Sequence, residues 1–280
     1  MAITKEEFNL IRQFVHEHSG ILIGDGKEYL VENRLNVILV QSKCDNFFQL
    51  HEKLKKDGGP LCIEVIDAMT TNETLWFRDT SFFTSLSNFV IPALLEKALS
   101  KPKVRIWSAA CSTGQEPYSV AMLLDQARGA MGKGAPPLDR FAILATDISP
   151  SVLSIARTGR YSQLAISRGM RAAFLERFFV HHGSSYEVAP AIRGIVTFRQ
   201  FNLKESFGSL GLFDFILCRN VLIYFSNELK SEIYHKLHQS LEKDGMLSIG
   251  ASESPRGYTT VFEQIMVDGA ALYRPSAHSG

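Results

Sequence analysis

The sequence predicts an α/β protein, in which an all-helical N-terminal region precedes a parallel sheet that carries a small antiparallel insertion. Three observations predict this fold class. Apolar residues recur only at helical spacing over about the first seventy positions, and after residue 101 short apolar runs alternate with amphipathic segments. Such alternation is typical of a parallel sheet with helices on both faces. Between about residues 167 and 197 the alternation stops around a polar turn, which predicts the insertion.

The N-terminal region begins with a well-marked helix. Thr4 is followed three residues later by Glu7, which is the pattern of a capping box, and apolar residues then recur at helical spacing until Gly20. Further helices are predicted over residues 29–39, 45–54 and 61–69. We therefore expect an all-helical domain over residues 1–76.

A linker and a second domain follow. From residue 79 a helix leads past Pro92 toward the sheet, so residues 77–100 are predicted to form a structured linker. The second domain is expected over residues 101–280, with the insertion at about 167–197. Its predicted strands cover residues 104–107, 141–146, 196–201, 213–218 and 245–250, with edge strands in 262–273. Its predicted helices cover residues 116–128, 149–157 and 228–241.

Composition narrows the class of protein further. The chain has 280 residues, 45% of them hydrophobic, and a formal net charge of +1, which argues against nucleic acid as a partner. Charges interrupt the long apolar stretches, and the first residues lack a basic segment before an apolar one, so we expect a cytoplasmic protein without membrane insertion. Four scattered cysteines predict reduced thiols and no metal site. Residues 1–76 carry a net charge of −4, and the remainder carries +5. The mildly basic remainder suits an acidic protein substrate.

A turn between a strand and a helix gives the first indication of a ligand. Residues 104–121 run from an apolar strand through small side chains at 108–114 into an amphipathic helix, whose unpaired N–H groups favour a bound ligand. The turn holds one glycine, whereas a dinucleotide site has G-x-G-x-x-G. Asp147 ends the next strand, where it can accept hydrogen bonds from a ribose diol or cap the following helix. A nucleoside without a pyrophosphate fits best.

Five motifs resemble those of one enzyme family. They are TTNETLWFR at residues 70–78, SAACSTGQEPYS at 108–119, TDIS at 146–149, FNL at 201–203 and CRNVLIYF at 218–225. In this order, and over nearly the whole chain, they resemble CheR-type chemoreceptor glutamate methyltransferases, also called chemotaxis protein methyltransferases. The resemblance implies a class I S-adenosylmethionine-dependent methyltransferase domain, which is Rossmann-like, with an N-terminal all-helical domain and a small antiparallel β-subdomain insertion.

The resemblance also implies a reaction, the O-methylation of glutamate side chains in the cytoplasmic helices of bacterial chemoreceptors. S-adenosylmethionine is the implied cofactor, and the products are glutamyl methyl esters and S-adenosylhomocysteine. A glutamate, with a pKa of about 4.3, is already ionised at neutral pH, so such an enzyme needs no general base. The sequence offers no obvious Ser-His-Asp or metal-ligand set, and RNVLIY at residues 219–224 differs from the Asn/Asp-Pro-Pro-aromatic clamp of amide and adenine N-methyltransferases.

The residues and the resemblance together predict the cofactor site. Asp147 and Asn202 are expected to contact the adenosine, although an asparagine that ends a strand in a turn is the plain alternative for Asn202. Glu116 is expected beside the cationic groups of the cofactor, or it only stabilises the N-terminus of its own helix. The predicted cofactor-binding residues are Asn72, Thr74, Arg78, Glu116, Asp147, Asn202, Leu203, Asn220 and Val221.

Two residues are predicted to act on the acceptor. The planar guanidinium of Arg78 can hold a carboxylate through two parallel hydrogen bonds and so orient an acceptor glutamate, or it forms an ordinary interdomain salt bridge. Tyr224 can donate a hydrogen bond to the other carboxylate oxygen, or it only packs. Arg78 and Tyr224 are therefore the predicted catalytic residues.

The family also suggests how receptors are recognised. It uses a basic face of its N-terminal domain near the substrate helix, and Lys27 and Arg34 are the best candidates for this role in an acidic domain. Some members bind a C-terminal pentapeptide tether of the receptor through a loop that residues 180–188 look too short to match. We expect a monomer that recognises the methylation helices of chemoreceptors directly. A methyltransferase for another acidic or small acceptor, and a receptor-docking adaptor without turnover, are the alternatives.

Overall fold

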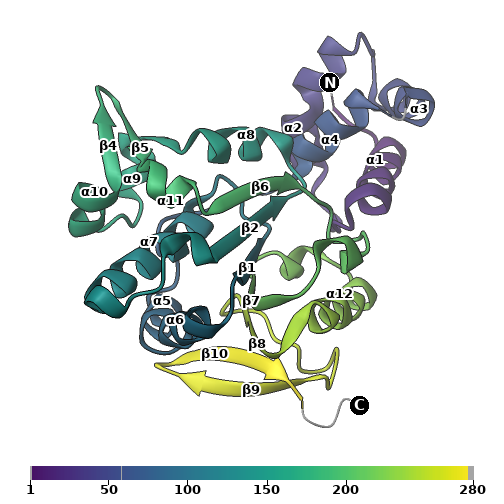
Figure 1. Ribbon diagram of the computed structural model, residues 1–280. Helices are drawn as coiled ribbons and strands as arrows, with labels where there is room; N and C mark the ends of the chain where they lie inside the picture. The colour runs from purple at the N-terminus through teal and green to yellow at the C-terminus, as the bar shows by residue number, and fades with distance from the viewer. Residues whose placement is uncertain (1, 58, 277–280) are drawn as a thin grey trace.

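The computed structural model of the protein describes residues 2–57 and 59–276, and a helical N-terminal part lies beside a larger α/β part (Figure 1). The N-terminal helices, drawn in purple and blue, are α1 Lys5–Ser19, α2 Glu28–Gln41, α3 Phe47–Asp57 and α4 Pro60–Met69. They pack around buried apolar side chains such as Phe8, Leu35 and Leu50. This arrangement confirms the predicted all-helical N-terminal domain.

The first helix begins and ends as the sequence predicts. The N–H of Thr4 donates to Oε2 of Glu7 (2.9 Å), and the N–H of Glu7 donates to Oγ1 of Thr4 (3.2 Å), which completes a capping box. Gly20 ends the helix with a φ of 80°, in the left-handed region that glycine adopts without strain. A Cβ at Gly20 would lie 2.4 Å from Cδ2 of Leu229, so glycine also permits close contact with the second domain.

The linker is a run of helical turns: α5 Thr80–Ser85, the π-helical turn η1 Leu86–Val90 and α6 Ile91–Ser100. The sequence predicts one helix here, and Pro92 explains the interruption. Proline has no N–H to donate, and its ring crowds the carbonyl of the residue four positions earlier. A wider π-helical turn directly before Pro92 relieves that crowding.

A seven-stranded sheet with the order β6-β2-β1-β7-β8-β10-β9 forms the centre of the α/β part (Figure 1). Its strands are β1 Val104–Ala109, β2 Phe141–Asp147, β6 Val196–Gln200, β7 Phe213–Cys218, β8 Leu241–Ile249, β9 Phe262–Val267 and β10 Ala270–Pro275. Strands from β6 to β8 pair in parallel, while β10 pairs antiparallel with both β8 and β9. The strand order reverses between β1 and β7, and ligands of open α/β sheets bind at such points.

Helices cover both faces of this sheet. The main ones are α7 Gln115–Ala130, α8 Pro150–Thr158 and α12 Asn227–Gln239, and the 3₁₀ turns are η2 Gly132–Gly134, η3 Leu138–Arg140, η4 Phe207–Leu210 and η5 Leu222–Tyr224. On β1, Ile106 belongs to the same buried cluster as Leu124 of α7, whereas Trp107 belongs to the cluster of Ile233 in α12. Because successive side chains of a strand point to opposite faces, both faces are buried, as the sequence predicts.

A smaller antiparallel sheet, of order β3-β5-β4, lies beside the main one (Figure 1). Its strands are β3 Arg160–Ser162, β4 Phe179–His182 and β5 Ser185–Val188, accompanied by helices α9 Gln163–Ser167, α10 Ala172–Phe178 and α11 Pro190–Arg193. The predicted antiparallel insertion is present, but it begins at Arg160, before the expected range 167–197, and residues 196–200 belong to the main sheet. β3 is only three residues long, and Arg160 pairs with the distant Glu187, so no local pattern indicated it.

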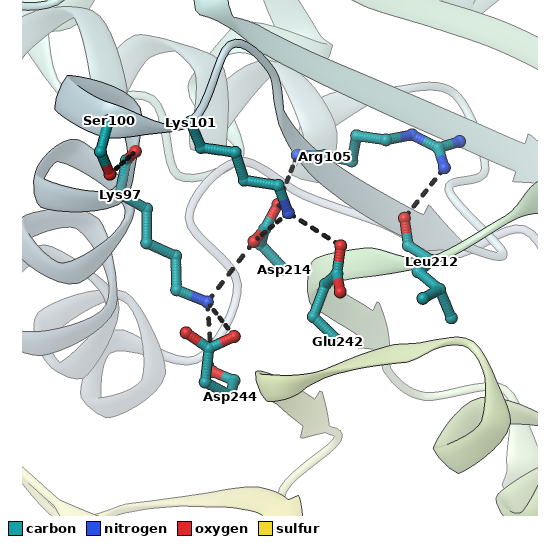
Figure 2. Close-up of polar contacts among 8 residues, drawn as sticks. All are labelled: Lys97, Ser100, Lys101, Arg105, Leu212, Asp214, Glu242 and Asp244. Atoms are coloured by element: carbon teal, nitrogen blue, oxygen red, sulfur yellow. Dashed lines mark hydrogen bonds and ion pairs between the residues drawn. The ribbon is translucent and has the colours of Figure 1, made fainter.

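A buried aspartate joins the linker to the start of β7 (Figure 2). Asp214 is 1% exposed, and its carboxylate accepts hydrogen bonds from Nζ of Lys101 (2.9 and 3.1 Å) and from the N–H of Arg105 (2.9 Å). Lys101 also donates to Glu242 (2.8 Å). Burial lowers the pKa of Lys101, but its bonds to Glu242 and Asp214 outweigh burial and leave that pKa above the ordinary value. This cluster lies at the amino ends of the strands, and it fixes the linker against the sheet.

Contacts between the two domains lie at the opposite, carboxyl edge of the sheet. Nζ of Lys204 donates to the carbonyls of His16 and Glu17 at the end of α1, where a cation is favoured by the helix dipole. Two residues beyond Gly20, the N–H of Leu22 donates to the carbonyl of Tyr224 in η5 (2.8 Å). The end of α1 is therefore fixed against the turn that follows β7.

Candidate active site

A cavity lies at the carboxyl ends of β1, β2 and β7, next to the point where the strand order reverses. Its walls come from residues 70–78, the turn after β1, the end of β2, residues 201–203 and the turn after β7. The cavity brings together all ten residues that the sequence predicts for the site, namely Asn72, Thr74, Arg78, Glu116, Asp147, Asn202, Leu203, Asn220, Val221 and Tyr224.

The turn after β1 brings backbone rather than bulky side chains to the cavity wall. Ala110 has a φ of 60°, Ser112 of 50° and Gly114 of 93°, so three residues of this short turn lie in the left-handed region. Such conformations cost on the order of 1–2 kcal/mol for a non-glycine residue and gather at functional sites. A Cβ on Gly114 would lie 3.0 Å from Cβ of Ala156 and 3.1 Å from Oη of Tyr161, so the one glycine of the turn is required where α7 begins.

Asp147 ends β2 and turns its carboxylate to this turn. Oδ2 accepts a hydrogen bond from the N–H of Ser112 (2.8 Å), and Oδ1 accepts one from the N–H of Ser149 (3.0 Å). Burial raises the pKa of this carboxyl above its ordinary value, although the backbone N–H groups oppose the rise. A carboxylate has about four acceptor positions, so each oxygen retains one for the hydroxyl of a ligand. Ser149, rather than Asp147, is the N-cap of α8, since its hydroxyl accepts from the N–H of Val152.

Glu116 belongs to a network of ion pairs with Arg219 and Asp79, which the sequence did not predict. Its carboxylate accepts hydrogen bonds from Oγ of Ser108 (2.8 Å) and from Nη1 of Arg219 (2.8 Å). The side chain of Arg219 is 2% exposed, also pairs with Asp79 (2.5 Å) and lies 4.0 Å from the ring centre of Phe82. A charged residue directly after a buried apolar strand was the cue in the sequence. This network links α7, the end of β7 and the linker through the buried guanidinium of Arg219.

Residues 70–74 are held over the cavity by contacts from both domains. Oγ of Ser112 donates to the carbonyl of Asn72 (2.8 Å), and Nδ2 of Asn72 donates to Oγ1 of Thr70 (2.9 Å). Arg34 donates to the carbonyls of Met69 (2.8 Å) and Thr70 (2.7 Å) from the N-terminal domain. Arg34 therefore holds the end of α4 and the start of the cavity wall. Its guanidinium, which was a candidate for receptor docking, is engaged in these contacts.

Arg78 differs from Arg219, the other arginine among the described cavity residues. Its Nη1 donates to the carbonyl of Glu73 (3.0 Å), and it forms no ion pair with any residue in the ranges 2–57 and 59–276. The carboxylate of Glu73 pairs with Arg168 instead. The interdomain salt bridge that was the alternative for Arg78 is thus not formed in the described part of the chain, and the cavity contains a guanidinium that is free to bind an anion.

Asn202 uses its side chain for the protein itself. Its Nδ2 donates to the carbonyl of His18 at the end of α1 (2.7 Å), and its Oδ1 accepts from the N–H of Lys204 (3.0 Å). The amide therefore joins the two domains at the cavity wall, a contact that the sequence analysis did not expect because His18 lies far away in the chain. Leu203 lies beside it in the same wall. One donor and one acceptor position of the amide remain for a ligand.

The turn after β7 completes the cavity. Asn220 has a φ of 59°, and its N–H donates to Oε2 of Glu253 (2.7 Å). The N–H groups of Val221 (3.1 Å) and Leu222 (2.7 Å) donate to Oε1 of the same carboxylate. Tyr224 lies one turn further, at the end of η5. Sequence reasoning missed Glu253, and the only cue was a lone acid shortly after Gly250 at the end of β8.

The residues that line the cavity fit an adenosyl group. A buried carboxylate with vacant acceptor positions matches a ribose diol, and the small side chains of Ala110 and Ser112 in the cavity wall let a ligand approach the backbone of the turn. Among the residues that the structure describes, no group of three or more His, Cys, Asp or Glu side chains is placed to hold a metal ion. Across the same residues, every helix is too short or too polar to cross a membrane.

The sheet order, the reversal point and the cavity define the protein as a class I S-adenosylmethionine-dependent methyltransferase. The comparisons with known proteins are more specific. Residues 6–70 match the family model described as "CheR methyltransferase, all-alpha domain", and residues 72–270 match "CheR methyltransferase, SAM binding domain". The chain belongs to the CheR methyltransferase family.

Two bacterial proteins are similar to the chain over nearly their whole length. "Chemotaxis protein methyltransferase 1" of Pseudomonas aeruginosa is 41% identical over 279 residues, which covers 98% of this chain and 99% of the relative. "Chemotaxis protein methyltransferase Cher2" of Pseudomonas putida is 41% identical over 274 residues and covers 96% and 97%. Among solved structures, a TehB-like SAM-dependent methyltransferase of Corynebacterium glutamicum is 14% identical, with a TM-score of 0.37, and covers 70% of this chain and 96% of that one.

Proposed function

We propose that the protein transfers a methyl group from S-adenosylmethionine to glutamate side chains in the cytoplasmic helices of bacterial chemoreceptors. The products are glutamyl methyl esters and S-adenosylhomocysteine. The names of the relatives support a role in chemotaxis. The observation that carries the choice of a carboxylate acceptor is Arg78, a guanidinium without an ion pair among the described residues, in the wall of the cavity.

Arg78 suits a carboxylate acceptor for geometric and electrostatic reasons. A guanidinium binds both oxygens of a carboxylate through parallel hydrogen bonds, and so fixes the direction in which one oxygen points. Arg219 cannot take this role, because Glu116 and Asp79 already share its charge. Tyr224 lines the same cavity, and its hydroxyl is a suitable second donor to the acceptor. We assign Arg78 and Tyr224 to the orientation of the acceptor glutamate.

The cofactor residues follow from the walls of the cavity. When bound, S-adenosylmethionine supplies a methyl group activated by a positively charged sulfur. Asp147 accepts hydrogen bonds from the hydroxyls of the ribose, and Asn202 and Leu203 contact the adenine. Glu116, held by Arg219, presents a carboxylate toward the amino end of the cofactor. The remaining wall residues, Asn72, Thr74, Arg78, Asn220 and Val221, enclose the cofactor and exclude water.

The reaction does not require a general base. A glutamate acceptor has a pKa of about 4.3 and is ionised at neutral pH. Catalysis then depends on placing the carboxylate in line with the methyl group, which contributes at most about 7–11 kcal/mol, and on removing water from the nucleophile. No histidine lines the cavity in the part of the chain that the structure describes, and the mechanism has no need of one.

Receptor recognition is proposed to act through the methylation helices themselves. Lys27 is exposed at the start of α2, whereas Arg34 is engaged at the end of α4. The β4–β5 hairpin turns within residues 183–184, which supports little role for a C-terminal pentapeptide tether. We place the reaction in the cytoplasm, where these receptor helices lie, and we expect a monomer to carry it out.

Transfer of a labelled methyl group tests this proposal. The protein is incubated with methyl-labelled S-adenosylmethionine and membranes that contain chemoreceptors, and the product is treated with alkali. Methyl esters release methanol under these conditions, so volatile label recovered from the receptor band supports O-methylation. Label that appears only on a free metabolite supports another acceptor, and the absence of transfer in a protein that binds the cofactor supports an adaptor.

A further inference from the structure

The carboxylate of Glu253, a residue that follows β8, binds the backbone of the turn that follows β7. Its own N–H donates to the carbonyl of Gly250 (2.9 Å), so residues 250–253 form a tight turn directly after β8. This turn directs the side chain of Glu253 back to the end of β7. Its carboxylate accepts four backbone N–H groups, from Asn220 (2.7 Å), Val221 (3.1 Å), Leu222 (2.7 Å) and Gly250 (2.7 Å).

These bonds stabilise a backbone conformation that few non-glycine residues adopt. Asn220 is left-handed, and three successive N–H groups, of residues 220, 221 and 222, converge on one point. Converging N–H groups of this kind form a concavity that binds anions, because the positive ends of their dipoles all point to the same place. Glu253 forms no ion pair with any described residue, so these N–H groups are what balance its half-buried charge.

Gly250 is required for this arrangement. A Cβ at that position would lie 2.6 Å from Oε2 of Glu253 and 2.7 Å from Nδ2 of Asn220. The absence of a side chain at Gly250 therefore allows the carboxylate to reach the turn. On the other side of the turn, Asn220 and Val221 face the cavity, while Glu253 is not among the cavity residues of the described chain.

We infer that Glu253 is a positioning residue of the methyltransferase site: its carboxylate acts as a built-in anion that holds Asn220 and Val221 in the shape that binds the cofactor. The inference rests on the proposed cofactor roles of these two residues. Tyr224 follows on the same turn and shares the effect, because its N–H donates to the carbonyl of Val221 (3.2 Å).

Removal of the carboxylate tests the inference. In Glu253→Ala, four N–H groups lose a charged acceptor, and we expect the Kd for S-adenosylhomocysteine to rise by roughly tenfold or more. The matched control is Glu263→Ala, which removes a carboxylate that is bound to Arg274 at the surface, and its Kd should stay within about twofold of the unsubstituted protein. Near-ultraviolet circular dichroism at the temperature of the titration establishes that each variant is folded.

Chemical rescue separates positioning from general damage to the fold. Formate fits where the deleted carboxylate was, so it should restore most of the lost affinity in Glu253→Ala, while chloride at the same ionic strength should not. Glu253→Gln keeps the size of the side chain but turns an NH2 group toward backbone N–H groups, so it should also weaken binding and should not respond to formate. If Glu253→Ala does not fold, the Glu253→Gln result decides.

Two results would overturn the inference. One is a folded Glu253→Ala, or failing that a folded Glu253→Gln, with a Kd within about twofold of the unsubstituted protein. The other is a loss in Glu253→Ala that formate does not recover, which would assign the effect to general disturbance. Since S-adenosylhomocysteine binding needs no receptor, neither result depends on the identity of the acceptor. A failure of the proposed function would instead appear as normal cofactor binding without transfer to receptors.

Discussion

We expect Asp147→Ala to weaken binding of S-adenosylmethionine and S-adenosylhomocysteine alike, because both contain the ribose that this carboxylate is proposed to hold. Hydrogen bonds to a charged acceptor contribute about 1.5–3 kcal/mol, which corresponds to roughly a tenfold to hundredfold increase in Kd. The substitution also removes the acceptor of the N–H groups of Ser112 and Ser149. Relaxation of the turn after β1 therefore adds to the loss, and we expect the upper part of the range.

Isothermal titration calorimetry with S-adenosylhomocysteine measures this effect without any acceptor present. The matched control is Asp139→Ala, which removes an exposed aspartate from η3, away from the cavity, and should leave Kd unchanged. Equal affinities in Asp147→Ala and the unsubstituted protein would refute the ribose assignment. Asp147 would then serve only to tie the turn after β1 to the start of α8.

Three further predictions follow from the cavity. Arg78→Lys keeps the charge but loses the paired donors, so kcat should fall by roughly tenfold or more while the Kd of S-adenosylhomocysteine changes little; equal losses in both would place Arg78 wholly in the cofactor site. Because burial raises the pKa of Asp147, affinity for S-adenosylhomocysteine should fall on acidification at a pH above the ordinary aspartate pKa of about 3.9, and Asp147→Asn should abolish that dependence; a flat profile down to this pH contradicts the proposed role. An isolated pentapeptide from a receptor C-terminus should bind with a Kd weaker than roughly 1 mM, and micromolar binding would show that the β4–β5 hairpin does hold a tether.

Local sequence patterns predicted the parts of the fold that local physics determines. The capping box of Thr4 and Glu7 and the glycine that ends α1 involve residues close in the chain, and the structure shows both. The parallel sheet was predictable because each buried strand is an apolar run of its own. Asp147, Asn202 and Asn220 follow strands whose carboxyl ends meet at one edge, so their position in one cavity was predictable from the pattern, whereas residues 72–78 were predicted from the family resemblance.

The features that escaped prediction depend on partners far away in the chain. Glu253 binds the turn at residues 220–222, and Arg219 joins Glu116 to Asp79, yet no spacing rule connects these positions. Asn202 was predicted to contact the adenosine, and its bond to the carbonyl of His18 was not predicted because His18 belongs to another domain. Such contacts are created by tertiary packing, so a single sequence does not reveal them.

The most direct test of the account is to locate the transferred methyl group on the acceptor. After incubation of chemoreceptor membranes with the protein and S-adenosylmethionine, tandem mass spectrometry of receptor peptides identifies the modified atom. The account predicts methyl esters on glutamate side chains of the cytoplasmic helices, with yields that fall sharply in Arg78→Lys. Methyl groups on nitrogen or on other residues, or receptors that remain unmodified while the cofactor is bound, would contradict it.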